Sequence, residues 1–304
     1  MSASLAWQEI RSISIRAEEL GYDSIWLPDH LMSSNPIVEC WTTLSALANV
    51  LDSIRLGPLV LCNSFRNPAL TAKMAASLDE ISNGRLEFGV GAGWKQDEYV
   101  GYGYEFPKPQ IRLAQLEEGI EIARRIWSQD FVTFKGTHYQ IREVVCLPKP
   151  VQAHVPITIG GTGNMMLRLI AKHGDRANWW LCPKELFSQR IKLLRCYEKE
   201  IQRKSPVESS ATTYVNISST RSDLQPNMER FYKETGATQP HSDWLKDVSS
   251  RTISGTPDEC IETIRKYADL GVAYFMIRPI DLPGLKGLEL FAEKVLDHAD
   301  AVKT

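Results

Sequence analysis

Apolar positions along the chain alternate between helical spacing and short continuous runs. The first helical pattern runs from Leu5 to Leu20 and stops at Gly21, and the apolar run that follows at 24–27 indicates a buried strand. The alternation then repeats. It predicts helices over 40–50, 68–81, 110–128, 164–173, 184–204, 256–270 and 285–300, and strands over 54–61, 85–91, 156–160, 176–181, 211–217 and 272–277. A polar hairpin is expected across 131–141, and 220–250 is only loosely patterned.

Strands separated by helices pair in parallel through right-handed crossovers. The pattern contains seven strands and opens on a helix, which fits a TIM (β/α)8 barrel that lacks its first strand; a doubly wound open sheet is the alternative. We favour the barrel because residues suited to catalysis or ligand binding follow several different strands. In a barrel the carboxyl ends of all strands meet at one mouth, where such residues form a single site. We expect one domain over 1–304, with insertions at about 95–150 and 220–250.

The composition limits the classes of molecule that the protein is expected to bind. The 304 residues are 43% hydrophobic and 24% charged, and 35 basic against 37 acidic residues give a net charge of −2. This balance argues against nucleic acid or a membrane surface and favours a small-molecule partner. The six cysteines show no CxxC pair and no metal-ligand spacing, so we expect reduced thiols in a cytoplasmic protein.

The loop formed by Gly160, Gly161, Thr162 and Gly163 joins a β-branched strand directly to an amphipathic helix. Free backbone N–H groups at the positive end of a helix form a cradle for an anion, most readily a phosphate. By itself, the same glycine cluster is equally consistent with a turn that only reverses the chain.

Other strand ends also carry suitable side chains. Asp29 and His30 follow the first visible strand, and histidine beside a carboxylate is suited to proton transfer near neutral pH. Alternatively, Asp29 caps the next segment and His30 is a surface residue. Cys62 and Asn63 follow the strand at 54–61, where polar groups serve either a ligand or the local backbone.

Glycine recurs at every second position in Gly89, Gly91 and Gly93. A strand face without side chains admits a flat ring, although it also relieves crowding inside a barrel. Arg278 ends the last strand, where it meets either an anion or Asp281. No HxH pair or set of strand-end carboxylates indicates a metal site.

Six segments together resemble one known superfamily. The chain is similar to the bacterial luciferase-like flavin monooxygenases, and within them to the branch of probable coenzyme F420-dependent oxidoreductases. The segments are EELGYDSIWLPDH (18–30), CWTTLSALA (40–48), RLGPLVLCNSFRNPAL (55–70), DEISNGRLEFGVGAGWKQDEY (79–99), LPKPVQAHVPITIGGTGNMMLRLIAKHGD (147–175) and SGTPDECIETIRKYADLGV (254–272).

The resemblance implies a TIM barrel that holds FMN or the deazaflavin F420 at its mouth, with Asp29 and His30 beside the ring. It implies a non-proline cis peptide and a bulge at the strand end around Val60, behind the ring. Carried over position by position, the cofactor-binding residues are Val60, Leu61, Cys62, Asn63, Gly91, Gly93, Trp94, Asp97, Gly160, Gly161, Thr162 and Gly163.

Two departures from the family pattern matter. Relatives begin with a strand that contributes to the pocket, whereas here a helix comes first. Trp94 stands where the sugar-phosphate dehydrogenases of the branch carry an acid, which points to an apolar or aromatic substrate. The leading expectation is hydride transfer between F420 and a small organic molecule. An FMN-dependent monooxygenase and a non-catalytic flavin-binding or partner subunit are the alternatives, and the resemblance also makes a homodimer possible.

Overall fold

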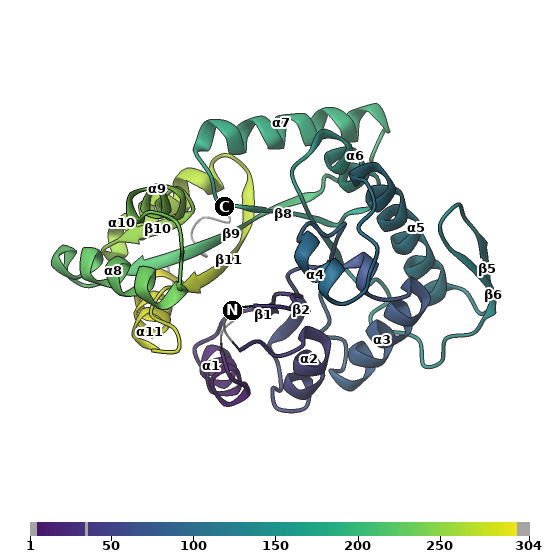
Figure 1. Ribbon diagram of the computed structural model, residues 1–304, viewed down its shortest axis with the longest axis horizontal. Coiled ribbons are helices and arrows are strands. Elements are labelled where there is room, and N and C mark those ends of the chain that lie inside the picture. Colours follow the sequence, from purple (N-terminus) through teal and green to yellow (C-terminus); the bar gives the residue numbers. More distant parts are fainter. Residues whose placement is uncertain (1–4, 34–35, 297–304) are drawn as a thin grey trace.

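The parallel strands lie in the interior of the fold, in the order of an incompletely closed ring, and most helices pack around them (Figure 1). The computed structural model describes residues 5–33 and 36–296. A seven-stranded sheet has the order β10-β9-β8-β7-β4-β3, with β11 also paired to β9, and β1 pairs in parallel with β2. The strands are β1 (Ser24–Leu27), β2 (Arg55–Pro58), β3 (Leu61–Cys62), β4 (Phe88–Gly91), β7 (Ile157–Gly160), β8 (Arg176–Trp180), β9 (Glu208–Ile217), β10 (Thr252–Gly255) and β11 (Val272–Pro279).

Backbone bonds connect β2 to the start of β4, because Leu56 N–H donates to Arg85 O and Glu87 N–H donates to Leu56 O. The two ends of the strand order, β11 and β1, are bridged by side chains: Ser24 Oγ lies 2.5 Å from Tyr274 Oη. Within the described residues no backbone pairing joins these two strands. This seam is the position at which the sequence pattern places the absent strand.

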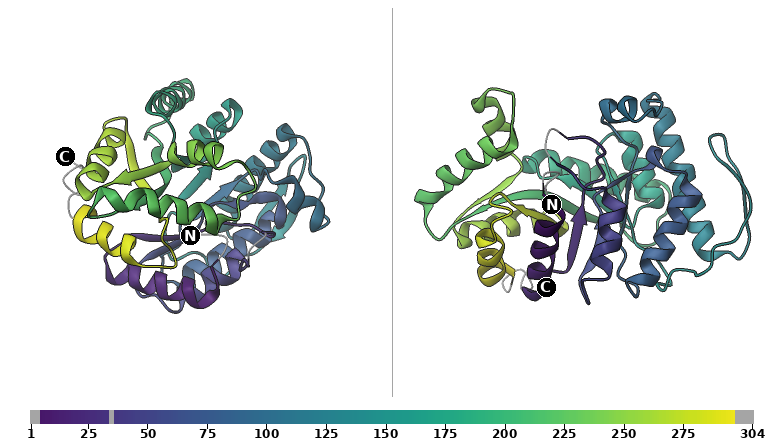
Figure 2. Two further views of the ribbon diagram at one scale, coloured as in Figure 1. Left: turned by 60° about the vertical axis from the view of Figure 1, so that its left-hand side comes forward. Right: turned by 60° about the horizontal axis from the view of Figure 1, so that its bottom comes forward.

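Most helices pack on the outer face of the strands, as the views in Figures 1 and 2 agree. Their ends follow local signals: Asn67 Oδ1 accepts the Ala69 and Leu70 N–H groups ahead of a proline at the first helical position, and Thr256 forms a capping box with Glu259. The helices are α1 (Trp7–Glu19), α2 (Cys40–Ala48), α3 (Pro68–Ile81), α4 (Gln96–Gly101), α5 (Pro109–Ser128), α6 (Asn164–His173), α7 (Lys184–Glu200), α8 (Leu224–Thr235), α9 (His241–Ser249), α10 (Pro257–Ala268) and α11 (Lys286–Phe291).

The predicted elements are present, with some differences. The strand expected over 54–61 is interrupted between β2 and β3, where the Leu59–Val60 peptide is cis, as the family resemblance implied. The segment 220–250, expected to be a loop-like insertion, contains α8 and α9, whose apolar faces pack around Phe231 and Trp244. The helix expected over 285–300 is α-helical only to Phe291 and continues as a π-helix over Ala292–Leu296; 297–300 lie outside the described residues.

The polar hairpin lies at the periphery beside α5 in both figures. Its strands are β5 (Val132–Lys135) and β6 (Gln140–Val144), so it extends slightly beyond the predicted segment. In the described part of the chain, no helix is long and apolar enough to cross a membrane.

A network of charged side chains occupies the interior at the amino ends of the strands. The Glu87 carboxylate is 2.6 Å from Arg55 Nε and 3.1 Å from Arg176 Nη1, and Arg176 also pairs with Glu208. Arg176 stacks over the Tyr274 ring at 4.1 Å. Because these residues come from several strands, their contacts close the barrel interior at the amino ends of the strands. We call this layer the floor, and the opposite end, at the carboxyl ends of the strands, is the mouth.

Candidate functional site at the barrel mouth

His30 is held by a carboxylate from a distant part of the chain. Its Nδ1 lies 3.0 Å from Oε1 and 3.2 Å from Oε2 of Glu98, which belongs to α4. In the neutral ring, Nδ1 therefore carries the proton and donates it to Glu98, so Nε2 is the nitrogen with a free lone pair. This arrangement fixes one tautomer of a histidine at the end of β1.

Glu98 itself is well supported. Its side chain is 1% exposed, and its Oε1 also accepts from Lys95 Nζ at 3.0 Å and from the Met32 N–H at 3.3 Å. A buried carboxylate with three donors is both neutralised and oriented. The sequence analysis did not identify Glu98. Its place in the acidic first turn of a short helix, four residues after Trp94, was the available signal.

Asp29, the neighbouring residue, is not the partner of the His30 ring. Its two oxygens accept from Arg66 Nη1 and Nη2 at 2.8 and 2.9 Å, and Oδ2 also accepts the Cys62 N–H at 2.9 Å. Asp29 thus ties the end of β1 to β3, and Glu98 holds the tautomer that we had expected a neighbouring carboxylate to fix. A catalytic role for Asp29 remains a prediction.

The wall next to His30 is made of glycine and one valine. An added Cβ would lie 2.9 Å from Val60 Cγ2 at Gly91 and 3.0 Å from the same carbon at Gly160. The Val60 side chain therefore packs against β4 and β7 at the two glycines, where those strands have no side chains. Any larger residue at Gly91 or Gly160 must displace Val60. Gly89, lower on β4, faces the Pro58 carbonyl. The result is a flat apolar surface at the mouth, which fits a planar ring.

Leu61 and Cys62 are both buried where β3 pairs with β4. Burial raises the pKa of the Cys62 thiol, whose sulphur lies 3.0 Å from Tyr99 Oη. Gly93, with φ +75°, is needed here because a Cβ would lie 2.0 Å from that hydroxyl. These residues fix the start of the segment that carries Glu98.

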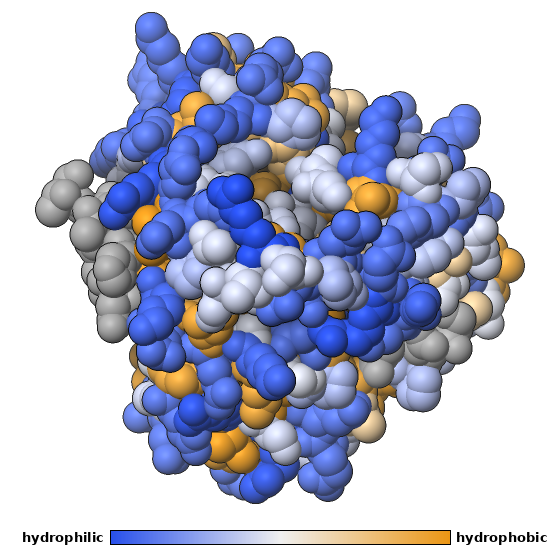
Figure 3. Space-filling view, turned by 90° about the vertical axis from the view of Figure 1, so that its left-hand side faces the viewer, coloured by the Kyte–Doolittle hydropathy of each residue, from blue (hydrophilic) through white to orange (hydrophobic). Residues whose placement is uncertain are grey.

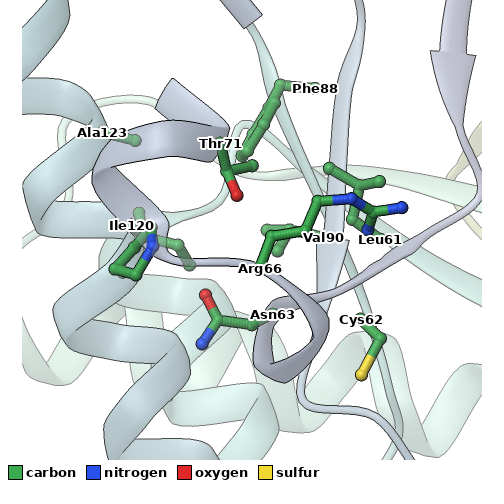
Figure 4. Close-up of a pocket in the computed structure, with 11 residues that line it drawn as sticks. Leu61, Cys62, Asn63, Arg66, Thr71, Phe88, Val90, Ile120 and Ala123 are labelled. Atoms are coloured by element: carbon green, nitrogen blue, oxygen red, sulfur yellow. The ribbon is translucent and has the colours of Figure 1, made fainter. Parts of the chain in front are cut away.

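Asn63 follows Cys62 and turns in a different direction (Figure 4). Its Nδ2 donates to Tyr139 Oη at 3.2 Å, and its Oδ1 is the atom nearest to a Cβ added at Gly119. Asn63 thus connects the strand end to α5 and the hairpin, and its assignment to the cofactor stays a prediction.

Trp94 lies in the loop before α4, and Asp97 lies in the first turn of that helix. The Trp94 side chain is 72% exposed, and its ring meets the His30 ring edge-on at a centroid distance of 6.1 Å. Asp97 is 63% exposed and lies 3.8 Å from Lys95 Nζ. The Trp94 ring therefore stands beside the His30 ring and is largely exposed to solvent, as is the Asp97 side chain.

The geometry of the glycine loop is compatible with the predicted anion cradle. Gly161 has φ +141°, and its carbonyl accepts from Trp179 Nε1 at 2.8 Å, which fixes the loop. Gly163 is the N-cap of α6 and offers no side-chain cap, and residues 162–165 are exposed. The first-turn N–H groups of a ten-residue helix thus face outward at its positive end. This geometry fits a phosphate group.

The fold and site define a (β/α) barrel whose strand ends carry a flat glycine wall, a glycine loop that opens a helix, and a histidine held by a carboxylate. The sequence profile of the luciferase-like monooxygenase family matches residues 1–274. The chain belongs to this family, and the prediction of a luciferase-like barrel is confirmed.

Several characterised proteins are similar along nearly their whole length. An F420-dependent glucose-6-phosphate dehydrogenase from Amycolatopsis mediterranei is 28% identical over 324 residues, covering 97% of this chain and 95% of the relative. The structure of an F420-dependent secondary alcohol dehydrogenase in complex with an F420-acetone adduct has a TM-score of 0.84 at 20% identity, covering 99% and 96% of the two chains. A riboflavin lyase with modified FMN and riboflavin has a TM-score of 0.85 at 16% identity, covering 98% and 86%.

Proposed function

We propose that the protein is an F420-dependent oxidoreductase that transfers a hydride between the deazaflavin and a small organic substrate. The observation that carries the proposal is the pair of His30 and Glu98 beside the glycine wall. The F420-dependent relative, aligned over 97% of this chain, supports the choice of cofactor. The six free cysteines fit a reducing, cytoplasmic location.

The bound deazaflavin would supply the hydride acceptor or donor. Val60, Gly91 and Gly160 would lie behind its ring, and the loop ending at Gly163 would bind its phosphate. The described residues fit such a group because Gly91 and Gly160 place no side chain against Val60 and the glycine loop gives α6 no side-chain cap.

His30 performs the proton transfer that accompanies hydride movement. When a substrate hydroxyl is oxidised, Nε2 takes its proton while Nδ1 keeps its own, and Glu98 stabilises the imidazolium that forms. In the reverse direction Nε2 returns the proton. Lys95, at 3.0 Å from Glu98, pairs with the carboxylate and holds it in place.

We expect a substrate other than the sugar phosphate of the glucose-6-phosphate dehydrogenases. The family resemblance implies an acid where Trp94 stands, whereas here an indole lies edge-on to the His30 ring. An aromatic surface beside the reacting atoms favours a substrate with an apolar or aromatic body.

The test begins with cofactor binding. We expect the purified protein to bind F420 at micromolar or lower concentration and FMN much more weakly, measured by calorimetric titration. Submicromolar FMN binding without F420 binding would instead support the FMN-dependent monooxygenase. Turnover is then followed by the visible absorbance of F420 with a panel of alcohols, and His30→Ala should abolish it. A His30→Ala variant that is fully active contradicts the proposal, and a folded wild type that binds cofactor but turns over no substrate indicates a non-catalytic subunit.

We also propose a homodimer, which is checked by light scattering of the purified protein.

A further inference from the structure

Three layers of side chains cross the interior of β8, β9 and β11. Arg176, Glu208 and Tyr274 form the lowest layer, described above. Two positions further along, Asn178 Nδ2 donates to Ser210 Oγ at 3.0 Å and lies 3.3 Å from Met276 Sδ. Because inward-facing residues recur at every second position of a strand, the next residues in the series, Trp180 and Arg278, face the mouth.

The third layer combines aromatic rings with one cation. The Trp180 and Tyr214 ring centroids are 5.1 Å apart. The Arg278 guanidinium carbon lies 5.3 Å from the centroids of Tyr214 and Phe231. Trp180 is 41% exposed, so its ring is open to solvent. The group lies at the carboxyl ends of its strands, and β8, which carries Trp180, is the neighbour of β7, which carries Gly160 of the glycine wall.

Arg278 is a cation without a carboxylate partner among the residues that the structure describes. Its Nε is buried and has no hydrogen-bond acceptor, and the group that bonds the guanidinium is the Tyr214 hydroxyl. Glu234 on α8 favours the charged form but lies beyond ion-pair distance, and it pairs with Arg230 at 3.7 Å. Asp281, the alternative partner in the sequence analysis, instead accepts the Gly287 N–H.

A buried guanidinium costs stability unless an anion compensates it. Burial indeed lowers the pKa of Arg278, which shows that its surroundings disfavour the charge. The other cations nearby are already neutralised, since Arg251 pairs with Asp247 and Arg176 with two glutamates. Among the residues that the structure describes, Arg278 is therefore the cation of this group that lacks a carboxylate partner, and its guanidinium offers a planar set of donors between aromatic rings.

We propose that Arg278 binds a carboxylate of the substrate, whose apolar body lies against Trp180 and Tyr214. This inference rests on the proposed function, because it places the substrate in the same mouth as His30. A monoanionic carboxylate matches the single guanidinium in charge and in planar geometry. The phosphate of the cofactor has its own cradle at Gly163, at the end of a different strand.

The binding experiment uses a matched pair of small aromatic probes, benzoate and its neutral amide benzamide, titrated calorimetrically into the purified protein at low salt. We expect benzoate to bind about tenfold more tightly than benzamide, the scale of one hydrogen-bonded charge pair. Arg278→Gln should remove the difference, and Arg278→Lys should retain part of it. The control Arg230→Gln changes a paired arginine on α8 and should preserve the preference.

Equal binding of benzoate and benzamide by the wild type, or an unchanged preference in Arg278→Gln, overturns the proposal. Inorganic phosphate that binds more tightly than benzoate, and loses this affinity in Arg278→Gln, overturns the choice of carboxylate. Titrations with F420 and with its deazaflavin fragment lacking the phosphate-containing tail separate the two sources of an anion. If Arg278→Gln weakens F420 binding but not binding of the fragment, the anion belongs to the cofactor and the proposal fails.

A thermal melt separates a ligand-binding role from a structural one. Removing an uncompensated buried cation should leave the Tm of Arg278→Gln unchanged or higher. A lower Tm with intact benzoate preference means that Arg278 only packs against Tyr214 and Phe231. The comparison of benzoate with benzamide needs no cofactor, so its outcome is independent of F420 binding. The carboxylate site can therefore be refuted while the proposed function stands, and the proposed function can be refuted while the carboxylate site stands.

Discussion

Glu98→Gln changes the charge beneath His30 while keeping the shape of the side chain. The wild-type carboxylate accepts from His30 Nδ1, Lys95 Nζ and the Met32 N–H, at 3.0, 3.0 and 3.3 Å. A carboxamide has one acceptor oxygen for these three donors, and its NH2 group must face one of them. The variant therefore weakens the orientation of the imidazole and removes the charge that stabilises the imidazolium.

The magnitude follows from the kind of bond that is lost. Hydrogen bonds to an ionised group contribute about 1.5–3 kcal/mol, and neutral ones about 0.5–1.5 kcal/mol. The difference of about 1–1.5 kcal/mol in the transition state, where His30 carries the proton, corresponds to a loss of about tenfold in kcat. Because Glu98 is 1% exposed, the unsatisfied NH2 group also lowers stability by about 1–3 kcal/mol.

The assay is the initial rate of F420 reduction with a substrate identified in the panel, together with the dissociation constant of F420. We expect kcat to fall about tenfold while F420 binding stays within about twofold, since Glu98 acts through His30 and not on the cofactor. Glu117→Gln is a matched control, because Glu117 also accepts from a lysine and a histidine, Lys172 at 2.8 Å and His173 at 3.1 Å, but on outer helices. Wild-type kcat in Glu98→Gln, or an equal loss in Glu117→Gln, refutes the reasoning.

Three further outcomes test other parts of the structure. Gly161→Ala places a Cβ 2.8 Å from Met166 Cγ at φ +141°, so F420 binding should weaken about tenfold, with less effect on binding of the tail-free fragment. The control Gly21→Ala changes another glycine with positive φ, +81°, remote from the loop, and should leave both affinities unchanged. Equal losses of affinity in the two variants contradict the cradle. Glu87→Gln leaves Arg55 without its carboxylate partner and Arg176 with Glu208 alone, and it should lower the free energy of unfolding by about 3 kcal/mol in urea titrations, near the low end of the range for buried pairs because Arg55 is 33% exposed. A loss below about 1 kcal/mol argues against the floor network. Burial lowers the pKa of His173 in spite of the nearby Glu117, so below about pH 6.5 the unfolded chain binds more protons at this residue than the folded protein does. Stability should therefore fall as the pH decreases from about 7.5 to about 5.5. His173→Asn should make Tm less dependent on pH over that interval, and an unchanged slope of Tm against pH contradicts this.

Local periodicity was sufficient for most elements, since helices with a clear apolar face, such as α6, and continuous apolar strands, such as β7, lie within a few residues of their predicted bounds. Short elements were less predictable. The six residues of α4 and the four of β10 are too short for a periodic pattern, and their conformation depends on partners elsewhere in the chain. The same holds for the loosely patterned 220–250, where α8 and α9 form because their apolar faces pack around Phe231 and Trp244.

By itself the sequence determined the parallel α/β barrel, the glycine loop with its helix N-terminus, and the identity of the strand-end residues. These features depend on residues that are close together in the sequence, so the spacing and type of those residues are enough to indicate them. The tertiary structure alone decided which partners those residues have: Glu98 rather than Asp29 holds His30, Asp29 binds Arg66, and Arg278 lacks a carboxylate partner among the described residues. Each of these contacts joins segments far apart in the chain, and only the closing of the strands into a ring brings them within hydrogen-bonding distance.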